Sequence, residues 1–373
     1  MVRRRIIRGA VGVIAGLGVL AGCTPSPHVN APIGSSSTQP DAPADLSAGR
    51  SEPVADPLYP DYGNPDVDVL HYGLALGYDP STRVLSGTAT ITLRAVKALN
   101  GLRLDFADNL KVGEASLDGT AVTATQSGHD VTFGTSLAAE TQAVLTVTYE
   151  GVPEQAPAPT TRGDFEDGLG MRPESDGSLW TMQEPYGAFT WYPDNDHPSD
   201  EALYDLTVTV PDGWSGVASG SFMGQTASGD ESVFTWHSAD PVASYLTTLA
   251  VDEFEKIEMT GPGDLPITAW IPRESMREFE RPLRQMPEHI DYIAERYGPY
   301  PFDAAGVVLV GGESAMETQE MITFSSALGS MGPDMIESVM VHELAHQWFG
   351  DAVTPVDWRG VWLNESMATY IED

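Results

Sequence analysis

The hydrophobic pattern divides the chain into a strand-rich part and a helical part. Between residues 61 and 255, apolar or β-branched residues occupy every second position in short runs, and Gly, Asp, Asn and Pro separate the runs. Such alternation predicts strands, most clearly at 83–94, 143–149 and 204–210. We therefore expect an all-β, sandwich-like domain over residues 61–255.

After residue 256 the pattern changes to a helical period. Over 274–297 apolar residues recur every three or four positions with charges between them, and two proline residues predict a break or kink. An apolar run at 306–310 predicts a strand, and a helix is predicted over 332–349, before Gly350. We expect a mixed α/β domain over 256–373, so the chain belongs to the α+β multidomain class.

The first 22 residues have the composition of an export signal. Four Arg and no acid precede an apolar stretch, 9–20, that is too short for a permanent membrane helix. The following Leu-Ala-Gly-Cys resembles the lipobox of bacterial lipoproteins, which implies cleavage and lipidation of Cys23, the only cysteine. The resemblance implies a lipoprotein anchored through Cys23 to the outer face of the bacterial cell membrane. An ordinary signal peptide with an incidental cysteine is the alternative.

Composition adds a tether and an acidic surface. Residues 23–60 are rich in Pro, Ser, Ala and Asp, which predicts a disordered tether. Across the 373 residues, a hydrophobic share of 41% fits folded domains. The formal net charge of −35 predicts a solvated acidic surface that repels nucleic acid, so we expect no nucleic-acid partner. The sequence does not indicate an oligomeric state.

Two histidines and one glutamate form a candidate metal site. His342 and His346 are four residues apart in the predicted helix, so both imidazoles can reach one metal ion. A catalytic zinc site needs a third protein ligand, and Glu365, separated from His346 by the eighteen residues 347–364, supplies a carboxylate. We expect one Zn²⁺ per chain. A buried polar network without metal is the alternative.

Glu343 is the predicted general base. It lies one position after His342, so it points about a third of a turn aside, near the open position of the metal. A carboxylate there can take a proton from an activated water and return it to the leaving amine.

These residues belong to a longer motif that resembles a known family. The segment 342–351, His-Glu-Leu-Ala-His-Gln-Trp-Phe-Gly-Asp, and the segment 362–370 look like the zinc signature of the aminopeptidase N family of gluzincins, peptidase family M1. The resemblance extends to 297–302 and 314–318. It implies a thermolysin-like catalytic domain and hydrolysis of N-terminal residues from peptides with a free N-terminus. It also implies a C-terminally incomplete domain, because the family's oxyanion-stabilising tyrosine lies beyond residue 373.

The same resemblance implies how the substrate amine is bound. Glu317 matches the family glutamate that grips the α-ammonium, with Ala315 and Met316 as further substrate-binding residues of the same loop. On the β domain, Glu184 is the predicted second amine ligand and Gln183 the substitute for it. A cationic amine in a partly dry cleft requires such carboxylates.

Small residues replace the family's residues at three positions. This chain has Ser314 where the family has Gly, Thr318 where it has Asn, and Ser366 where it has Gly. These differences leave the fine substrate preference open. We also expect Asn364 to be the N-cap of the helix that carries Glu365, and Asp351 to be a partner of a ligand histidine.

Two other functions are compatible with the same residues. One is an endopeptidase or an epoxide-acting hydrolase that uses the same zinc core. The other is a catalytically incomplete, membrane-tethered binding protein, which the missing tyrosine favours.

Overall fold

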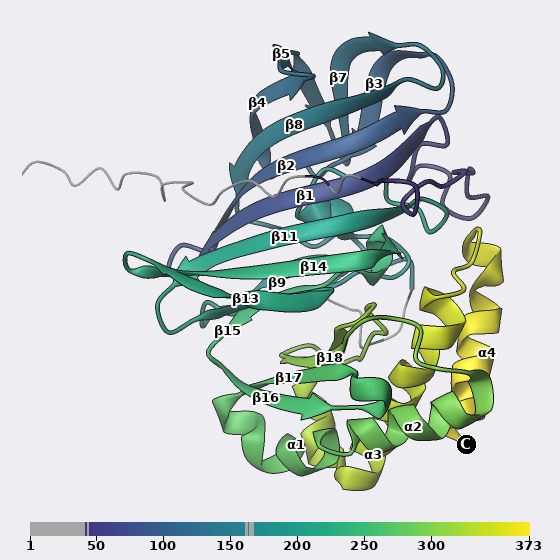
Figure 1. The fold of residues 1–373 in the computed structure, drawn as a ribbon. Coiled ribbons are helices and arrows are strands. Elements are labelled where there is room, and N and C mark those ends of the chain that lie inside the picture. Colours follow the sequence, from purple (N-terminus) through teal and green to yellow (C-terminus); the bar gives the residue numbers. More distant parts are fainter. Residues whose placement is uncertain (1–41, 43–44, 161–162, 164–167) are drawn as a thin grey trace, which may run out of the picture. The chain divides into compact units, whose positions relative to one another are not determined.

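The computed structural model describes residue 42, residues 45–160, residue 163 and residues 168–373. The strands of the first part are β1 (Val67–Asp79), β2 (Val84–Ala95), β3 (Leu99–Asp105), β4 (Lys111–Leu117), β5 (Thr120–Ala121), β6 (Ala124–Ser127), β7 (Asp130–Leu137), β8 (Gln142–Gly151), β9 (Gly170–Pro173), β10 (Leu179–Met182), β11 (Glu201–Pro211), β12 (Ser215–Ala218), β13 (Ser221–Ser228), β14 (Glu231–Ala243) and β15 (Leu249–Asp252). The second part has strands β16 (Phe254–Thr260), β17 (Pro266–Pro272), β18 (Ala305–Val310) and β19 (Ile322–Ser325), and helices α1 (Met276–Leu283), α2 (Met286–Tyr297), α3 (Pro333–His346) and α4 (Val361–Glu372) (Figure 1).

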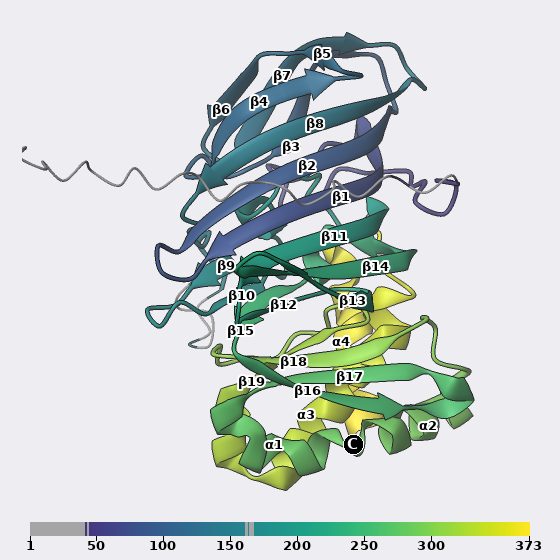
Figure 2. The same ribbon diagram turned by 60° about the vertical axis from the view of Figure 1, so that its left-hand side comes forward.

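The first part is a β domain of layered sheets, which confirms the predicted class. Its largest sheet has the order β13-β14-β11-β1-β2-β8-β4-β5. Two smaller sheets, β3-β7-β6 and β12-β15-β10-β9, share one hydrophobic core with it (Figure 2). The alternating burial of β2 and β8 explains why their sequences gave a period of two, whereas β1 is buried along almost its whole length.

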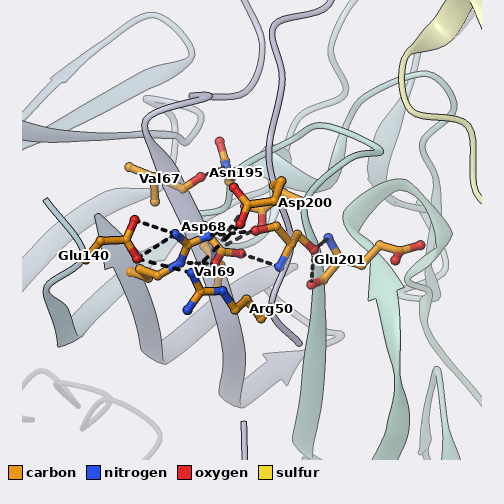
Figure 3. A network of polar contacts seen from close by, with 11 residues as sticks. Arg50, Val67, Asp68, Val69, Glu140, Asn195, Asp200 and Glu201 are labelled. Carbon is orange, nitrogen blue, oxygen red and sulfur yellow. Dashed lines mark hydrogen bonds and ion pairs between the residues drawn. The ribbon is translucent and has the colours of Figure 1, made fainter. Parts of the chain in front are cut away.

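A buried arginine ties strands of this domain to the chain that precedes them. Arg94 on β2 is 1% exposed, and its Nε donates to Asp68 Oδ2 on β1 at 2.7 Å. Its two terminal nitrogens donate to Glu140 Oε1 at 3.0 Å and to the carbonyl of Ser51 at 2.8 Å. Figure 3 shows Asp68 and Glu140, two carboxylates of this network. A buried charge needs this many partners because isolation from water would otherwise be costly.

The predicted disordered tether of 23–60 needs correction at its C-terminal end. Residues 45–60 lie against the β domain, where Ser51 N donates to Asp68 Oδ1 and Val54 N donates to Ser199 Oγ, both at 3.0 Å. A hydrophobicity argument underestimated this segment because it is held by backbone and carboxylate hydrogen bonds. The residues before 42, including the predicted signal peptide 1–22 and Cys23, lie outside the described residues.

The second part combines a mixed sheet with helices, as predicted for 256–373. The sheet has the order β16-β17-β18-β19, and its last two pairings are parallel. The apolar run at 306–310 is β18, and the helix predicted over 274–297 is broken into α1 and α2 as the prolines required. The predicted domain boundary at residue 255 falls within β16, which already pairs with β17. Among the described residues, no helix has the length and apolar character needed to cross a membrane.

Candidate metal centre

Helix α3 brings the two ring nitrogens of the predicted metal site together. His342 and His346 lie on one face of the helix, and their Nε2 atoms are 3.2 Å apart. After His346 the backbone opens into a single π-type turn, η7 (Gln347–Asp351), in which Gly350 has a φ of 142°. A Cβ at Gly350 would lie 3.3 Å from His346 Nδ1, so only glycine fits both the conformation and the space.

The other nitrogen of each ring is already bonded. His342 Nδ1 lies 3.0 Å from Glu372 Oε2, and His346 Nδ1 lies 3.2 Å from the carbonyl oxygen of Phe349. Because a carboxylate and a carbonyl only accept hydrogen bonds, both Nδ1 atoms carry a hydrogen, and in the neutral form of each ring the lone pair lies on Nε2. Two Nε2 atoms at this distance can share a proton in a hydrogen bond or bind one metal ion between them.

Helix α4 supplies the third donor of the predicted set. Glu365 Oε2 lies 3.6 Å from His342 Nε2, and Glu365 Oε1 lies 4.0 Å from His346 Nε2. Ligand atoms around a tetrahedral zinc ion with bonds of ~2.0–2.1 Å are roughly 3.3 Å apart. The three side chains therefore fit one zinc ion, with two neutral imidazoles and one carboxylate as donors. Burial lowers the pKa of His342, but Glu365 and Glu372 outweigh it and raise that pKa.

Glu343, the predicted base, is buried beside this centre. Its side chain is on α3 and is 6% exposed, and a carboxylate oxygen of Glu343, one of Glu317 and a ring nitrogen of His346 lie within 4.8 Å of one another. Burial, and then the charges of Glu317 and Glu365, raise the pKa of Glu343 well above its usual range. The carboxylates of Glu343 and Glu317 therefore lie close to each other beside the predicted metal ligands.

The loop that carries Glu317 is fastened to the metal helix by Gln347. The Nε2 of Gln347 donates to the carbonyl oxygen of Glu317 at 2.9 Å. Its Oε1 accepts from Glu320 N and from the hydroxyl of Tyr300, each at 3.0 Å. Gln347 is fully buried and follows His346 directly, so the loop position is set relative to the metal ligands. Glu317 is 4% exposed, and its Oε1 has no hydrogen-bond partner among the described residues.

A chain of threonine hydroxyls joins this loop to the strand that precedes Glu184. Thr318 Oγ1 lies 2.9 Å from Thr323 Oγ1, which lies 2.8 Å from Thr248 Oγ1, and Thr181 Oγ1 follows at 3.2 Å. Thr318, which stands where the family has Asn, thus keeps the loop attached.

Glu184, half-buried at the end of this strand, lies near the same tyrosine as Glu317. The Tyr245 hydroxyl is buried, and burial, then Glu317, Asp351 and Glu184, raise its pKa. The two predicted amine ligands are therefore within electrostatic reach of one hydroxyl group.

The prediction that Gln183 binds substrate needs correction. Its side chain is fully buried, and its Nε2 lies 2.8 Å from Ser244 O and from Thr247 O, to which it donates. Its Oε1 accepts from Trp191 Nε1 at 2.9 Å. Gln183 is occupied in holding the 244–247 segment, and a substrate has no access to it.

Met316 and Ala315 also differ in what they offer. Met316 is 3% exposed and packs into the hydrophobic core, and its backbone pairs with Thr323. Its side chain therefore supports the loop and faces no open space, while Ala315 is half-buried before it.

Two minor expectations are not met. Asn364 is inside α4, not at its N-cap, because Asp357 starts the preceding turn η8 (Trp358–Gly360) by accepting from Arg359 N at 3.0 Å. Asp351 is 3% exposed and neither carboxylate oxygen has a hydrogen-bond partner among the described residues, so no ligand histidine bonds to it. Burial, with Glu317 and Glu343, raises the pKa of Asp351 well above its usual range.

Sequence reasoning missed Glu372 and Gln347. Glu372 follows Glu365 by seven residues, which is about two helical turns and the same face of α4. That spacing was visible in the sequence and could have indicated a partner for the metal ligands. Gln347 had no comparable signal, since its partners lie in a distant loop.

Comparison with known proteins covers both parts of the chain. The peptidase M1 N-terminal domain model matches residues 68–246, and the peptidase family M1 domain model matches residues 282–373. An M1 zinc metallopeptidase from Deinococcus radiodurans, solved with a Tyr-Ser-Ala substrate, is 30% identical with a TM-score of 0.76. That comparison covers 85% of this chain and 72% of the other.

Curated relatives agree on the family. Glutamyl aminopeptidase of Homo sapiens is 26% identical over 52% of this chain and 21% of its own length, and probable aminopeptidase 1 of Sulfurisphaera tokodaii is 31% identical over 55% and 27%. This chain therefore spans only about a quarter of these relatives. Aminopeptidase N of Acetobacter pasteurianus is 24% identical over 81% of this chain and 88% of its own length. With both domain models matched and the solved structure aligned over most of its length, the chain belongs to peptidase family M1.

Proposed function

We propose that this chain forms the zinc site and the amine-binding residues of an aminopeptidase, a hydrolase that removes N-terminal residues from peptides. The observation that carries the proposal is the convergence of His342, His346 and Glu365 next to two buried carboxylates, Glu343 and Glu317. Relatives in the family bear the name aminopeptidase, and a solved member holds a tripeptide substrate.

Zn²⁺ is the cofactor, one per chain, and His342, His346 and Glu365 are its ligands in this proposal. When bound, zinc supplies a Lewis acid for a peptide carbonyl and lowers the pKa of a water toward ~7. The carboxylate of Glu343 then accepts a proton from the attacking water and returns it to the leaving amine. The near-complete burial of Glu343 keeps its carboxylate directed at the site and away from bulk water.

Recognition of a free N-terminus rests on Glu317 and Glu184. Within the described part of the chain, the buried Oε1 of Glu317 has no hydrogen-bond partner, and a buried acceptor left unpaired is costly. The α-ammonium of a peptide supplies a charged donor for it, and Glu184 shares the same cation from the β domain. Substrates with a blocked amine lack that cation, so the site selects peptides with a free N-terminus.

The test compares zinc content and hydrolysis in matched variants. The chain is expected to bind about one zinc, and a full-length version is expected to release chromogenic amides of neutral amino acids, with Glu343→Gln abolishing release while zinc stays bound. Glu337→Gln, on a half-exposed position of the same helix, serves as the control. Activity that survives both o-phenanthroline and Glu343→Gln would refute the proposal.

Two other outcomes would identify the alternatives. Unchanged cleavage of N-acetylated peptides would indicate an endopeptidase. One zinc per chain without hydrolysis of any peptide in a library would indicate a binding protein.

We also propose that the chain is exported and held at the outer face of the cell membrane by a lipid on Cys23. The support is the basic start, the short apolar stretch and the Leu-Ala-Gly-Cys segment of the sequence.

A further inference from the structure

The segment before β1, residues 45–62, connects the β domain to the helix that carries Glu365; we call it the strap. Its first half is fixed to the β domain, since the hydroxyl of Ser51 bonds the backbone of Glu201 at 3.1 Å and Ser51 N donates to Asp68. Its second half ends in Tyr62, which stacks on Tyr186 with ring centroids 3.9 Å apart. Both ends of the strap are therefore held by the β domain.

Between these ends, Asp56 reaches the other part of the protein. Asp56 is 2% exposed. Its Oδ1 accepts from Leu58 N at 2.6 Å and from Tyr59 N at 2.9 Å, which closes a turn in the strap itself. Its Oδ2 accepts from the backbone N–H of Trp358 at 2.7 Å, in a buried hydrogen bond across 302 positions of sequence. Oδ1 therefore stabilises the turn in the strap, and Oδ2 contacts the start of the Glu365 helix.

Trp358 is the point at which the Glu365 helix begins. It opens η8, which runs directly into α4, and its ring packs edge-on against Tyr245 with centroids 4.8 Å apart. Glu365 follows seven residues later, about 10 Å along the helix axis. At the far end of α4, Glu372 bonds His342 and Ser338. The helix that carries Glu365 is therefore held at its start by Asp56 and at its end by Glu372.

We infer that Asp56 is a positioning residue for the zinc ligand Glu365, and that the strap is part of the structure that sets the metal site. The negative carboxylate at the start of η8 and α4 also has a favourable interaction with the helix dipole. Without it, Trp358 N would be a buried donor with no acceptor, and the start of α4 would be free to shift. The inference rests on the proposed function for the identity of the metal.

A rival explanation is that Asp56 only stabilises the fold. Under that explanation, replacing Asp56 would make amide hydrogens throughout the protein exchange faster to the same degree and would leave the zinc affinity unchanged. A positioning role instead predicts a local loosening of α4 and a weaker metal site. Residues that orient metal ligands typically change affinity by about 10- to 100-fold when they are replaced.

The experiment uses the full chain with Asp56→Asn. Asparagine can close the same turn through Oδ1, but it directs an NH₂ group at Trp358 N, so the hydrogen bond to α4 is lost, together with the charge contact of Oδ2 with His197 Nε2 at 3.9 Å. Asp79→Asn is the matched control, because Asp79 closes the turn between β1 and β2 by accepting from Ser81 N at 2.9 Å. Zinc affinity is measured by competition with a chromogenic chelator, and amide hydrogen exchange is measured on the metal-free protein.

We expect zinc to bind about tenfold more weakly to Asp56→Asn. In the metal-free protein, the amides of α4 should exchange faster while those of α3 and β1 keep their rates. Asp79→Asn should match the wild type in both measurements. Wild-type affinity together with unchanged or evenly lowered protection in Asp56→Asn would overturn the inference. If the wild-type chain takes up no zinc, the metal assignment fails, and exchange in α4 still decides whether Asp56 positions the helix.

Discussion

Glu372 Oε2 lies 3.0 Å from His342 Nδ1, so the helix that offers the ligand Glu365 also orients a ligand histidine on the neighbouring helix. A carboxylate in this position fixes the tautomer and makes the opposite nitrogen a better donor to a metal. Helices α3 and α4 therefore form the site as a pair.

This contact gives the first prediction. Replacing Glu372 with Ala should weaken zinc affinity by about tenfold or more, and Gln, which keeps an uncharged acceptor, should fall in between. Chelator competition at neutral pH measures the three affinities. Glu295→Gln, on an exposed position of α2, should bind zinc like the wild type. Equal affinity for Ala and wild type at position 372 would contradict the prediction.

Gln347 should control the Glu317 loop without affecting the metal. Gln347→Met keeps the volume but leaves the carbonyl of Glu317, the N–H of Glu320 and the hydroxyl of Tyr300 without their partner. The free energy of unfolding should fall by on the order of 2–4 kcal/mol, since unpaired buried groups cost ~1–3 kcal/mol each. Denaturant unfolding measures the change.

The same variant should also bind a free amino acid more weakly while its zinc content stays near one. Calorimetric titration with L-tryptophan tests this part, with the half-exposed Gln225→Met as the control. A loss of zinc equal to the loss of amino-acid binding would show that the loop and the metal site are not separable.

Gly350 should accept no side chain. Gly350→Ala adds a Cβ 3.3 Å from His346 Nδ1 and Asn364 Nδ2 at a φ of 142°, so we expect a loss of about 1–3 kcal/mol in stability and weaker zinc binding. Gly213→Ala is a matched control, because Gly213 also has a positive φ but no atom within 4 Å of the added Cβ. If both variants lose the same stability and both keep zinc affinity, the contact with His346 has no effect.

The β domain should lose stability as the pH rises. Burial raises the pKa of Asp105 from 3.8 to about 8, with the charge of Asp196 adding to the effect. An acid whose folded-state pKa is raised keeps its proton in the folded protein while the unfolded chain releases it. Its contribution to stability is complete below pH 3.8 and is lost as the pH rises through about 8.

Asp105→Asn tests this dependence. Its amide oxygen can still accept from Gly63 N and Asp196 N, as Asp105 Oδ2 does. The melting temperature of the variant should therefore decline less between pH 5 and pH 8 than that of the wild type. Asp118→Asn, at a turn with an exposed side chain, should keep the wild-type slope. Parallel slopes for wild type and Asp105→Asn would contradict the assignment.

Lipidation can be tested independently of activity. Expressed with its own first residues in a bacterium, the chain should incorporate labelled palmitate and sediment with membranes. Cys23→Ser should abolish the label and release the protein from the membrane fraction. Labelling that persists in Cys23→Ser would exclude this residue as the anchor.

The sequence by itself determined the features that depend on neighbours along the chain. A period of two predicted β2, β8 and β11, and an interval of four placed His342 and His346 on one face of α3, because helix and strand geometry repeats over a few residues. The ligand motif also identified Glu365 before the structure placed it beside the two imidazoles.

Only the tertiary structure decided which residues support that site. The carboxylate of Asp56 accepts a hydrogen bond from Trp358 N across 302 positions of sequence. The side chain of Gln347 donates to the backbone of a loop some 30 positions away. The side-chain amide of Gln183, predicted to bind substrate, instead donates to the backbone carbonyls of Ser244 and Thr247. Such hydrogen bonds depend on which distant backbone groups are buried together, and a local pattern of residues carries no information about that.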